Sequence, residues 1–142
     1  MTKALRPADL HEISAAAEMA KMDKERQWKR AQAETERALR DAFMEREVKP
    51  EAMDRINEAV KRAAEQGLHE IQVMSFSSRF CNDRGRSINN MDPDWPQSLE
   101  GFAKKGYEFF DKELRPLGFK LAAQIISFPD GMPGDVAVYL RW

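Results

Sequence analysis

The chain of 142 residues has only one cysteine and two histidines, and it has no long apolar run. One cysteine excludes an intrachain disulfide framework and a cysteine-rich zinc site, and two histidines leave few ligands for other transition metals. A transmembrane helix would need a run of about 18 apolar residues. Charged residues interrupt the apolar positions of the first twenty residues, which argues against a signal peptide. We therefore expect a cytoplasmic protein that does not bind membranes.

The sequence also lacks a surplus of either charge. It has 23 basic and 24 acidic side chains. The balance is local as well: residues 1–47 hold ten of each sign, residues 48–68 four of each, and residues 69–142 nine basic and ten acidic. Nucleic-acid-binding segments and membrane-surface helices usually carry an excess of Lys and Arg. Nucleic acid is therefore the weakest of the partners that we consider.

Common catalytic and cofactor motifs are missing too. The sequence contains no Gly-x-Ser-x-Gly, His-Glu-x-x-His, Gly-x-Gly-x-x-Gly or P-loop pattern. Asn90, Asp92 and Asp94 copy the first ligand spacings of an EF-hand loop, but Trp95 and Gly101 stand where that loop needs glycine and glutamate. We therefore predict no catalytic residue, no metal site and no cofactor.

An uninterrupted run of helix-forming residues is the clearest positive feature. No glycine or proline stands between Ala8 and Arg46, and Ala, Glu, Lys and Arg dominate that stretch. Pro7 suits a first helical position. The pattern predicts a helix over residues 7–46, about 60 Å long at 1.5 Å per residue. Because this exceeds the diameter of so small a domain, we expect part of the helix to project or to pair with another chain.

The apolar face of this helix is uneven. It follows a heptad spacing at first, is broken by polar residues and then resumes loosely, at Leu10, Ile13, Ala17 and Ala20 and then Ala31, Ala38, Leu39, Ala42 and Phe43. A coiled-coil dimer and a solvated helix whose two ends pack both remain open. Trp28 stands in a charged stretch, which is typical of an interface anchor or of an ordinary exposed aromatic. The candidate partner interface is Trp28, Leu39 and Phe43.

The rest of the chain alternates helix and strand signals. The predicted elements are a helix over 50–66 capped by Gly67, a strand from Ile71, an irregular loop over 77–96, a helix over 96–116, and two hairpin strands over 119–125 and 136–142. In the first strand, Met74 and Phe76 fall on the opposite parity from Ile71 and Val73. We therefore expect both faces of that strand to be covered along part of its length.

This order of elements predicts an α+β fold with two parts. The parts are a long helical extension over residues 1–47 and a small α+β domain over residues 48–142. Since a helix joins the first two strands, we expect them to be parallel, with the third strand antiparallel to the second. The result would be a three-stranded mixed sheet with helices on one face. The last strand ends at Trp142, and an edge there offers a further route to a homodimer.

The loop over residues 77–96 is the most unusual segment. Loops of about twenty residues are long for a compact domain and are often functional. This one follows a strand and precedes a helix, where ligands bind in many α/β proteins. Its candidate anion-binding residues are Arg79, Arg84, Arg86 and Ser78, because guanidinium groups match phosphate and carboxylate oxygens. The alternative is a surface loop whose polar side chains satisfy its own backbone.

Cys81 lies within the same loop. We expect the neighbouring arginines to lower the pKa of its thiol. The phosphatase arrangement needs an arginine six positions after the cysteine, however, and Ser87 stands there. A buried, inert cysteine is the commoner situation. We therefore do not take Cys81 as a catalytic residue.

These features favour a non-enzymatic interaction or regulatory protein. It would bind a protein partner, or a second copy of itself as a homodimer, through its N-terminal helix. The alternative is an enzyme or binding protein for a small phosphorylated or carboxylated ligand, held by the 77–96 loop. Nucleic-acid binding through the same arginines, with Phe80 stacking on a base, is a third and weaker hypothesis.

Overall fold

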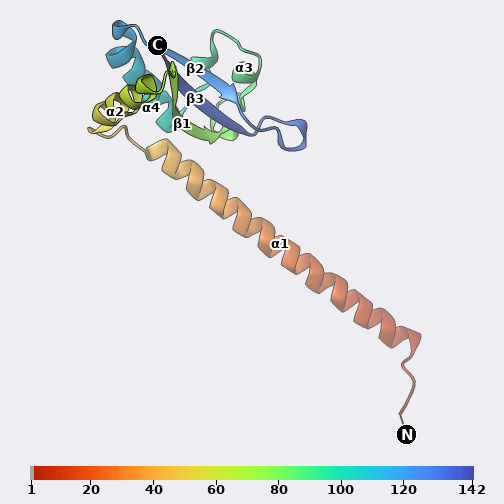
Figure 1. Cartoon of the computed structure of the whole chain (residues 1–142). Helices are drawn as coiled ribbons and strands as arrows, with labels where there is room; N and C mark the ends of the chain where they lie inside the picture. Colours follow the sequence, from red (N-terminus) through yellow and green to blue (C-terminus); the bar gives the residue numbers. More distant parts are fainter. Residues whose placement is uncertain (1) are drawn as a thin grey trace. The chain divides into compact units, whose positions relative to one another are not determined.

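The computed structural model describes residues 2–142, which fall into two compact units that meet between Asp41 and Ala42. The first unit is dominated by one continuous helix, α1 (Pro7–Glu45; Figure 1). The last turn of α1 belongs to the second unit. The second unit contains α2 (Ala52–Glu65), β1 (Glu70–Ser77), α3 (Arg86–Asn89), α4 (Gly101–Phe109), β2 (Lys120–Ile125) and β3 (Asp135–Arg141). The α+β composition and the long N-terminal helix are thus confirmed.

Local chemistry accounts for the start of α1 and the end of α2. Pro7 opens α1, and the N–H of Arg6 donates to the Asp9 carboxylate at 3.1 Å. At the end of α2, Gly67 has φ +79°, and the N–H groups of Gly67 and Leu68 donate back to the carbonyls of Ala64 and Ala63. This is a Schellman cap, and it needs a residue without a side chain at Gly67.

No helix within residues 2–142 combines the length and apolarity needed to cross a bilayer.

The sheet differs from the mixed sheet that the sequence suggested. Its order is β1-β3-β2, and β3 pairs antiparallel with both neighbours (Figure 1). β1 and β2 therefore run in the same direction but are separated by β3. The physical reason lies in β3, where Val136, Ala137, Val138 and Leu140 are at most 1% exposed. A strand so thoroughly buried occupies the centre of the sheet, so the expectation of an edge strand ending at Trp142 was wrong.

A β-bulge in β1 corrects a second expectation. The pairing with β3 shifts between Gln72 and Met74, so Ile71 lies opposite Leu140, Met74 opposite Val138 and Phe76 opposite Val136. Because those three β3 residues share one face of the sheet, the bulge brings Ile71, Met74 and Phe76 to that face despite their odd spacing. The change of parity therefore marks an extra residue and not a strand covered on both sides.

Two clusters of apolar side chains form the core. The first joins Phe76, Cys81, Ile88, Leu99, Ala103, Ile125, Val136 and Val138. The second joins Phe110, Leu114 and Leu140, with Met53, Ile56, Val60 and Ile71 packed against them. Residues of α2, α3 and α4 therefore share clusters with the buried residues of β3.

The helix expected over residues 96–116 is divided in the structure. Trp95–Ser98 forms a 3₁₀ turn, and Leu99 and Glu100 are extended, so α4 begins only at Gly101. After α4 the chain continues as a π-helical turn over Phe110–Leu114, which buries both of those residues. Pro116 then lies in a final 3₁₀ turn, where its missing N–H is tolerated.

Gly101 allows the last turn of α1 to lie close to α4. Gly101 has φ +56°, and a Cβ there would lie 2.8 Å from the Cα of Met44 and 3.0 Å from the carbonyl oxygen of Phe43. Backbone atoms cannot yield as a flexible side chain can. Phe43 packs beside this contact, with its ring centroid 4.8 Å from that of Phe80 and 5.4 Å from that of Phe76.

We expect Gly101→Ala to lower the free energy of unfolding by about 2–4 kcal/mol, from the left-handed backbone and the steric clash together. Gly118→Ala is the matched control, since Gly118 has φ +102° but nothing within 4 Å of its ideal Cβ. The control variant loses about 1 kcal/mol. Urea unfolding of both variants measures the difference, and equal losses would contradict the close approach.

Candidate functional site

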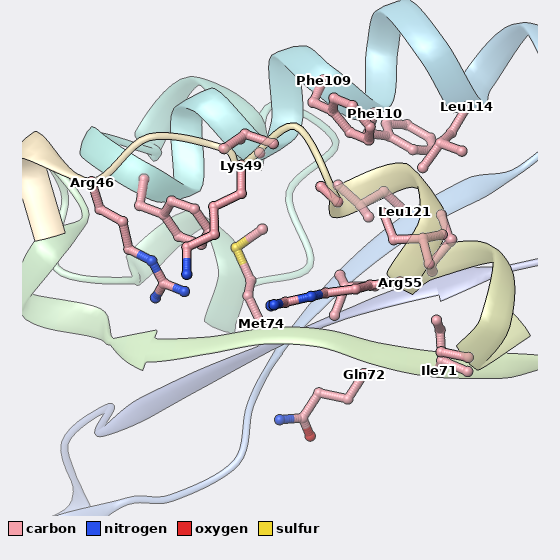
Figure 2. Close-up of a pocket in the computed structure, with 18 of the residues that line it drawn as sticks. Arg46, Lys49, Arg55, Ile71, Gln72, Met74, Phe109, Phe110, Leu114 and Leu121 are labelled. Atoms are coloured by element: carbon pink, nitrogen blue, oxygen red, sulfur yellow. The ribbon is translucent and has the colours of Figure 1, made fainter.

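A cavity of about 270 Å³ lies within the second unit (Figure 2). Its lining comes from α2, α4, the π-helical turn and all three strands, with the segment 46–49 at one side. The apolar lining residues are Val48, Ala52, Ile56, Ala59, Ile71, Val73, Met74, Phe102, Gly106, Phe109, Phe110, Leu114, Leu121 and Leu140. The site is therefore an apolar cavity between helices and sheet.

Small residues on the helices leave this space open. Ala59 of α2 and Gly106 of α4 both line the cavity. At Gly106, a Cβ would lie 2.5 Å from the terminal methyl of Met74, so the glycine makes room for the Met74 side chain. Larger residues at these two positions would occupy the cavity or push Met74 into it.

Three basic side chains form the rim of the cavity. Arg46 follows the end of α1, Lys49 lies in the next segment and Arg55 belongs to the first turn of α2. Figure 2 shows their charged ends directed toward the same region beside Met74. The Arg46 guanidinium lies 4.1 Å from the ring centroid of Phe102, within cation–π distance. Within residues 2–142, none of the three forms an ion pair.

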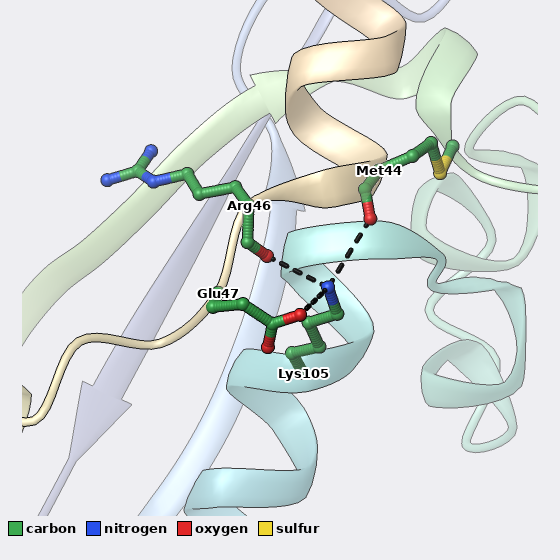
Figure 3. A network of polar contacts seen from close by, with 4 residues as sticks. All are labelled: Met44, Arg46, Glu47 and Lys105. Atoms are coloured by element: carbon green, nitrogen blue, oxygen red, sulfur yellow. Dashed lines mark hydrogen bonds and ion pairs between the residues drawn. The ribbon is translucent and has the colours of Figure 1, made fainter.

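Lys105 of α4 fixes the segment that carries this rim (Figure 3). Its ammonium group donates to the carbonyl oxygens of Met44 at 3.4 Å and Arg46 at 3.1 Å, and to a Glu47 carboxylate oxygen at 2.6 Å. A cation is favourable where a helix leaves its last carbonyls without intrahelical partners. Because Glu47 is the one acidic residue in the cavity lining, Lys105 also pairs with the one carboxylate of that lining.

Sequence reasoning missed the rim residues. Arg46, Lys49 and Arg55 lie around the expected domain boundary, where Glu47, Glu51 and Asp54 balance them in number. A count of charge by segment therefore gives no signal. The sequence does show basic residues on both sides of Pro50, close to the start of an amphipathic helix. Only the packing of α2 onto the sheet directs their side chains to one place.

The loop over residues 77–96 contains more regular structure than expected, including the short helix α3. Asp83 accepts hydrogen bonds from the N–H groups of Gly85 and Ser87, both at 3.0 Å. Burial would raise the pKa of Asp83, but hydrogen bonds from Ser87 and Gly85 outweigh it and hold that pKa below the ordinary value. The Ser78 hydroxyl is buried and donates to the Pro133 carbonyl at 2.9 Å.

The four candidate anion-binding residues are thus placed differently from one another. Arg79, Arg84 and Arg86 are exposed, and none of them lines the cavity. Ser78 instead ties the loop to the turn between β2 and β3, because its N–H also donates to the Gly134 carbonyl at 2.8 Å.

The three candidate partner residues of α1 also differ. Trp28 and Leu39 are 62% and 59% exposed. Phe43 is half-buried against Phe76 and Phe80, so its ring is engaged within its own chain.

The pKa of the Cys81 thiol is raised, whereas the sequence led us to expect a lowered pKa. Its side chain is 4% exposed, and burial, with the Asp83 carboxylate as a second cause, raises the pKa of the thiol to about 11. The neighbouring arginine side chains are exposed and do not offset these effects. Cys81 is part of the first core cluster.

We expect the folded protein to resist alkylation at Cys81. At pH 8, a pKa near 11 leaves about 0.1% thiolate, so iodoacetamide should react at least a hundredfold more slowly than with the urea-unfolded chain. The pKa of the Cys81 thiol is also higher in the folded chain than in the unfolded chain. The contribution of the protonated thiol to the free energy of unfolding is therefore complete below pH 9 and is lost as the pH rises toward 11. Cys81→Ala should remove that pH dependence, and rapid labelling of the folded protein at pH 7 would contradict the buried thiol.

No family model, curated protein or solved structure matches this chain, so its function is inferred from the geometry above.

Proposed function

We propose that residues 42–142 form a binding domain for a small, largely apolar molecule. The observation that carries this proposal is the cavity of about 270 Å³, whose walls are apolar side chains of α2, α4 and the sheet. Ligand pockets in proteins begin at roughly 300 Å³, so the cavity suits a small ligand. If each heavy atom takes about the 30 Å³ that a water molecule takes in the liquid, the cavity holds a ligand of about nine heavy atoms.

The lining residues favour binding over catalysis. The ionisable groups among them are Arg46, Glu47, Lys49 and Arg55. Three of these are cations, and Glu47 is paired with Lys105 at 2.6 Å. A nucleophile held beside a general base is therefore missing from the cavity lining. This proposal keeps a small ligand, which the sequence suggested as an alternative, but moves it from the 77–96 loop to the cavity.

A second function, self-association through α1, has a separate observation in its favour. Trp28 and Leu39 are eleven positions apart, which is about three helical turns, so they lie on one face of α1. Gln32 and Thr35 lie between them on that face, and the Thr35 hydroxyl donates to the Ala31 carbonyl at 2.9 Å. Trp28 and Leu39 therefore present two exposed apolar side chains to a partner helix.

Charge complementarity indicates a second copy of α1 in the antiparallel orientation. Residues 22–33 contain four basic and two acidic side chains, whereas residues 34–45 contain four acidic and two basic ones. An antiparallel pair that sets Trp28 against Leu39 of the second copy brings these segments together with opposite net charge. We therefore propose a homodimer formed by the C-terminal half of α1.

Filling the cavity should abolish ligand binding. Ala59→Leu adds apolar volume inside the cavity, whereas Ala64→Leu makes the same change at an exposed position of α2 that does not line it. With methyl-labelled methionine, octan-1-ol should shift the NMR signal of the Met74 methyl saturably in the wild type and in Ala64→Leu. In Ala59→Leu the shift should disappear. Equal titrations of the two variants would contradict the proposed site.

The α1 dimer predicts a concentration-dependent mass. In sedimentation equilibrium at low salt, the wild type should approach twice its 16.4 kDa monomer mass, and Trp28→Ala/Leu39→Ala should remain monomeric. Salt should weaken the association, because the complementary charges are exposed. Lys3→Ala/Leu5→Ala alters exposed residues outside the paired half and serves as the control. A wild type that stays monomeric at about 100 μM would contradict the dimer.

A further inference from the structure

We infer that the ligand of the cavity is an aliphatic carboxylate of about eight to ten carbons. Its chain lies among the apolar lining, and its carboxylate faces Arg46, Lys49 and Arg55. This inference rests on the proposed small-molecule binding function, and it adds the chemical class of the ligand.

The residues that line the cavity include more cations than carboxylates, although the whole chain has a net charge of −1. The lining contains three cations and one carboxylate, and that carboxylate is held by Lys105 at 2.6 Å. Arg46, Lys49 and Arg55 therefore create a local positive field beside an apolar cavity. An anion at the rim relieves the repulsion among the three cations, which a neutral ligand cannot do.

The rim cations come from two segments that meet at the cavity. Arg46 and Lys49 lie between α1 and α2, and Arg55 reaches the same region from the first turn of α2 (Figure 2). A head group at that point would be within reach of side chains from both segments. The attached chain would pass Met74 toward Phe110 and Leu140, which line the cavity and are buried.

Arg46 is prepared for a planar anion. Its guanidinium carbon lies 4.1 Å from the ring centroid of Phe102, which is itself a lining residue. Stacking on a ring leaves the N–H groups at the guanidinium edge able to donate two parallel hydrogen bonds to one carboxylate. Lys105 holds the Arg46 carbonyl at 3.1 Å and so limits movement of the backbone that carries this side chain. Lys105 is therefore a positioning residue for the rim.

The size of the cavity sets the length of the chain. A volume of about 270 Å³ holds about nine groups of water size at roughly 30 Å³ each. Each methylene that moves from water into the cavity should raise the affinity about fourfold. Affinity should therefore rise steeply from butanoate to octanoate and level off beyond decanoate. A flat series would overturn the assignment of an aliphatic chain.

The decisive experiment compares octanoate with octan-1-ol, which share the chain and differ in the charge of the head group. Binding is followed at low salt through the Met74 methyl signal, in the wild type and in Arg46→Gln/Lys49→Gln/Arg55→Gln. We expect the triple variant to bind octanoate at least tenfold more weakly and octan-1-ol within twofold of the wild type. The octanoate difference should shrink as salt rises.

A matched control removes the same charge elsewhere. Lys61, Arg62 and Lys104 are exposed on α2 and α4, and none of them lines the cavity. Lys61→Gln/Arg62→Gln/Lys104→Gln should bind octanoate within about twofold of the wild type. Equal losses of affinity in the two triple variants would assign the effect to net charge and would overturn the binding of the carboxylate by the rim cations.

The outcomes separate this inference from the function on which it rests. Binding of octan-1-ol and octanoate with equal affinity, unaffected by the rim substitutions, would overturn the carboxylate assignment and leave the apolar site standing. Failure of both probes to shift the Met74 methyl would overturn the binding function as well. Circular dichroism of each variant verifies that the fold is retained in the samples compared.

Discussion

Burial of β3 is the constraint on which the second unit depends. Val136, Val138 and Leu140 are at most 1% exposed, and they take part in both core clusters. A strand that excludes water this completely must be paired along both edges, which gives the order β1-β3-β2. The same requirement explains the bulge in β1, because Ile71, Met74 and Phe76 can face those β3 residues only if one extra residue is accommodated. That register also positions the strand residues that line the cavity.

The junction at the end of α1 links the core to the rim of the cavity. Gly101 permits the backbone of Met44 to approach α4, Phe43 packs on Phe76 and Phe80, and Lys105 binds the carbonyls of Met44 and Arg46. Apolar packing and charge-assisted hydrogen bonds thus act on one short segment. Since Arg46 lies in that segment, the packing of the core fixes the backbone from which this rim cation projects.

Strong local signals in the sequence predicted most elements and few of their contacts. The run without glycine or proline gave α1, the helical spacing before Gly67 gave α2, and alternation around a turn-rich segment gave β2 and β3. The predicted sheet order was wrong because strands compete for pairing partners. The helix that connects β1 to β2 favoured a parallel pair, whereas burial of β3 places that strand between them. The arginines of the 77–96 loop drew attention by composition, whereas the rim cations were hidden by nearby acids in the sequence.

By itself, the sequence determined where most of the chain is helical or extended, because propensity, spacing and turn residues act over a few positions. It also excludes an intrachain disulfide and a cysteine-rich metal site within these 142 residues, since they contain one cysteine. Tertiary structure alone decided which strand is central, why the Cys81 thiol is a weak acid and which cations converge on the cavity. Burial and electrostatic fields depend on groups far apart in the chain, and packing is what brings those groups together.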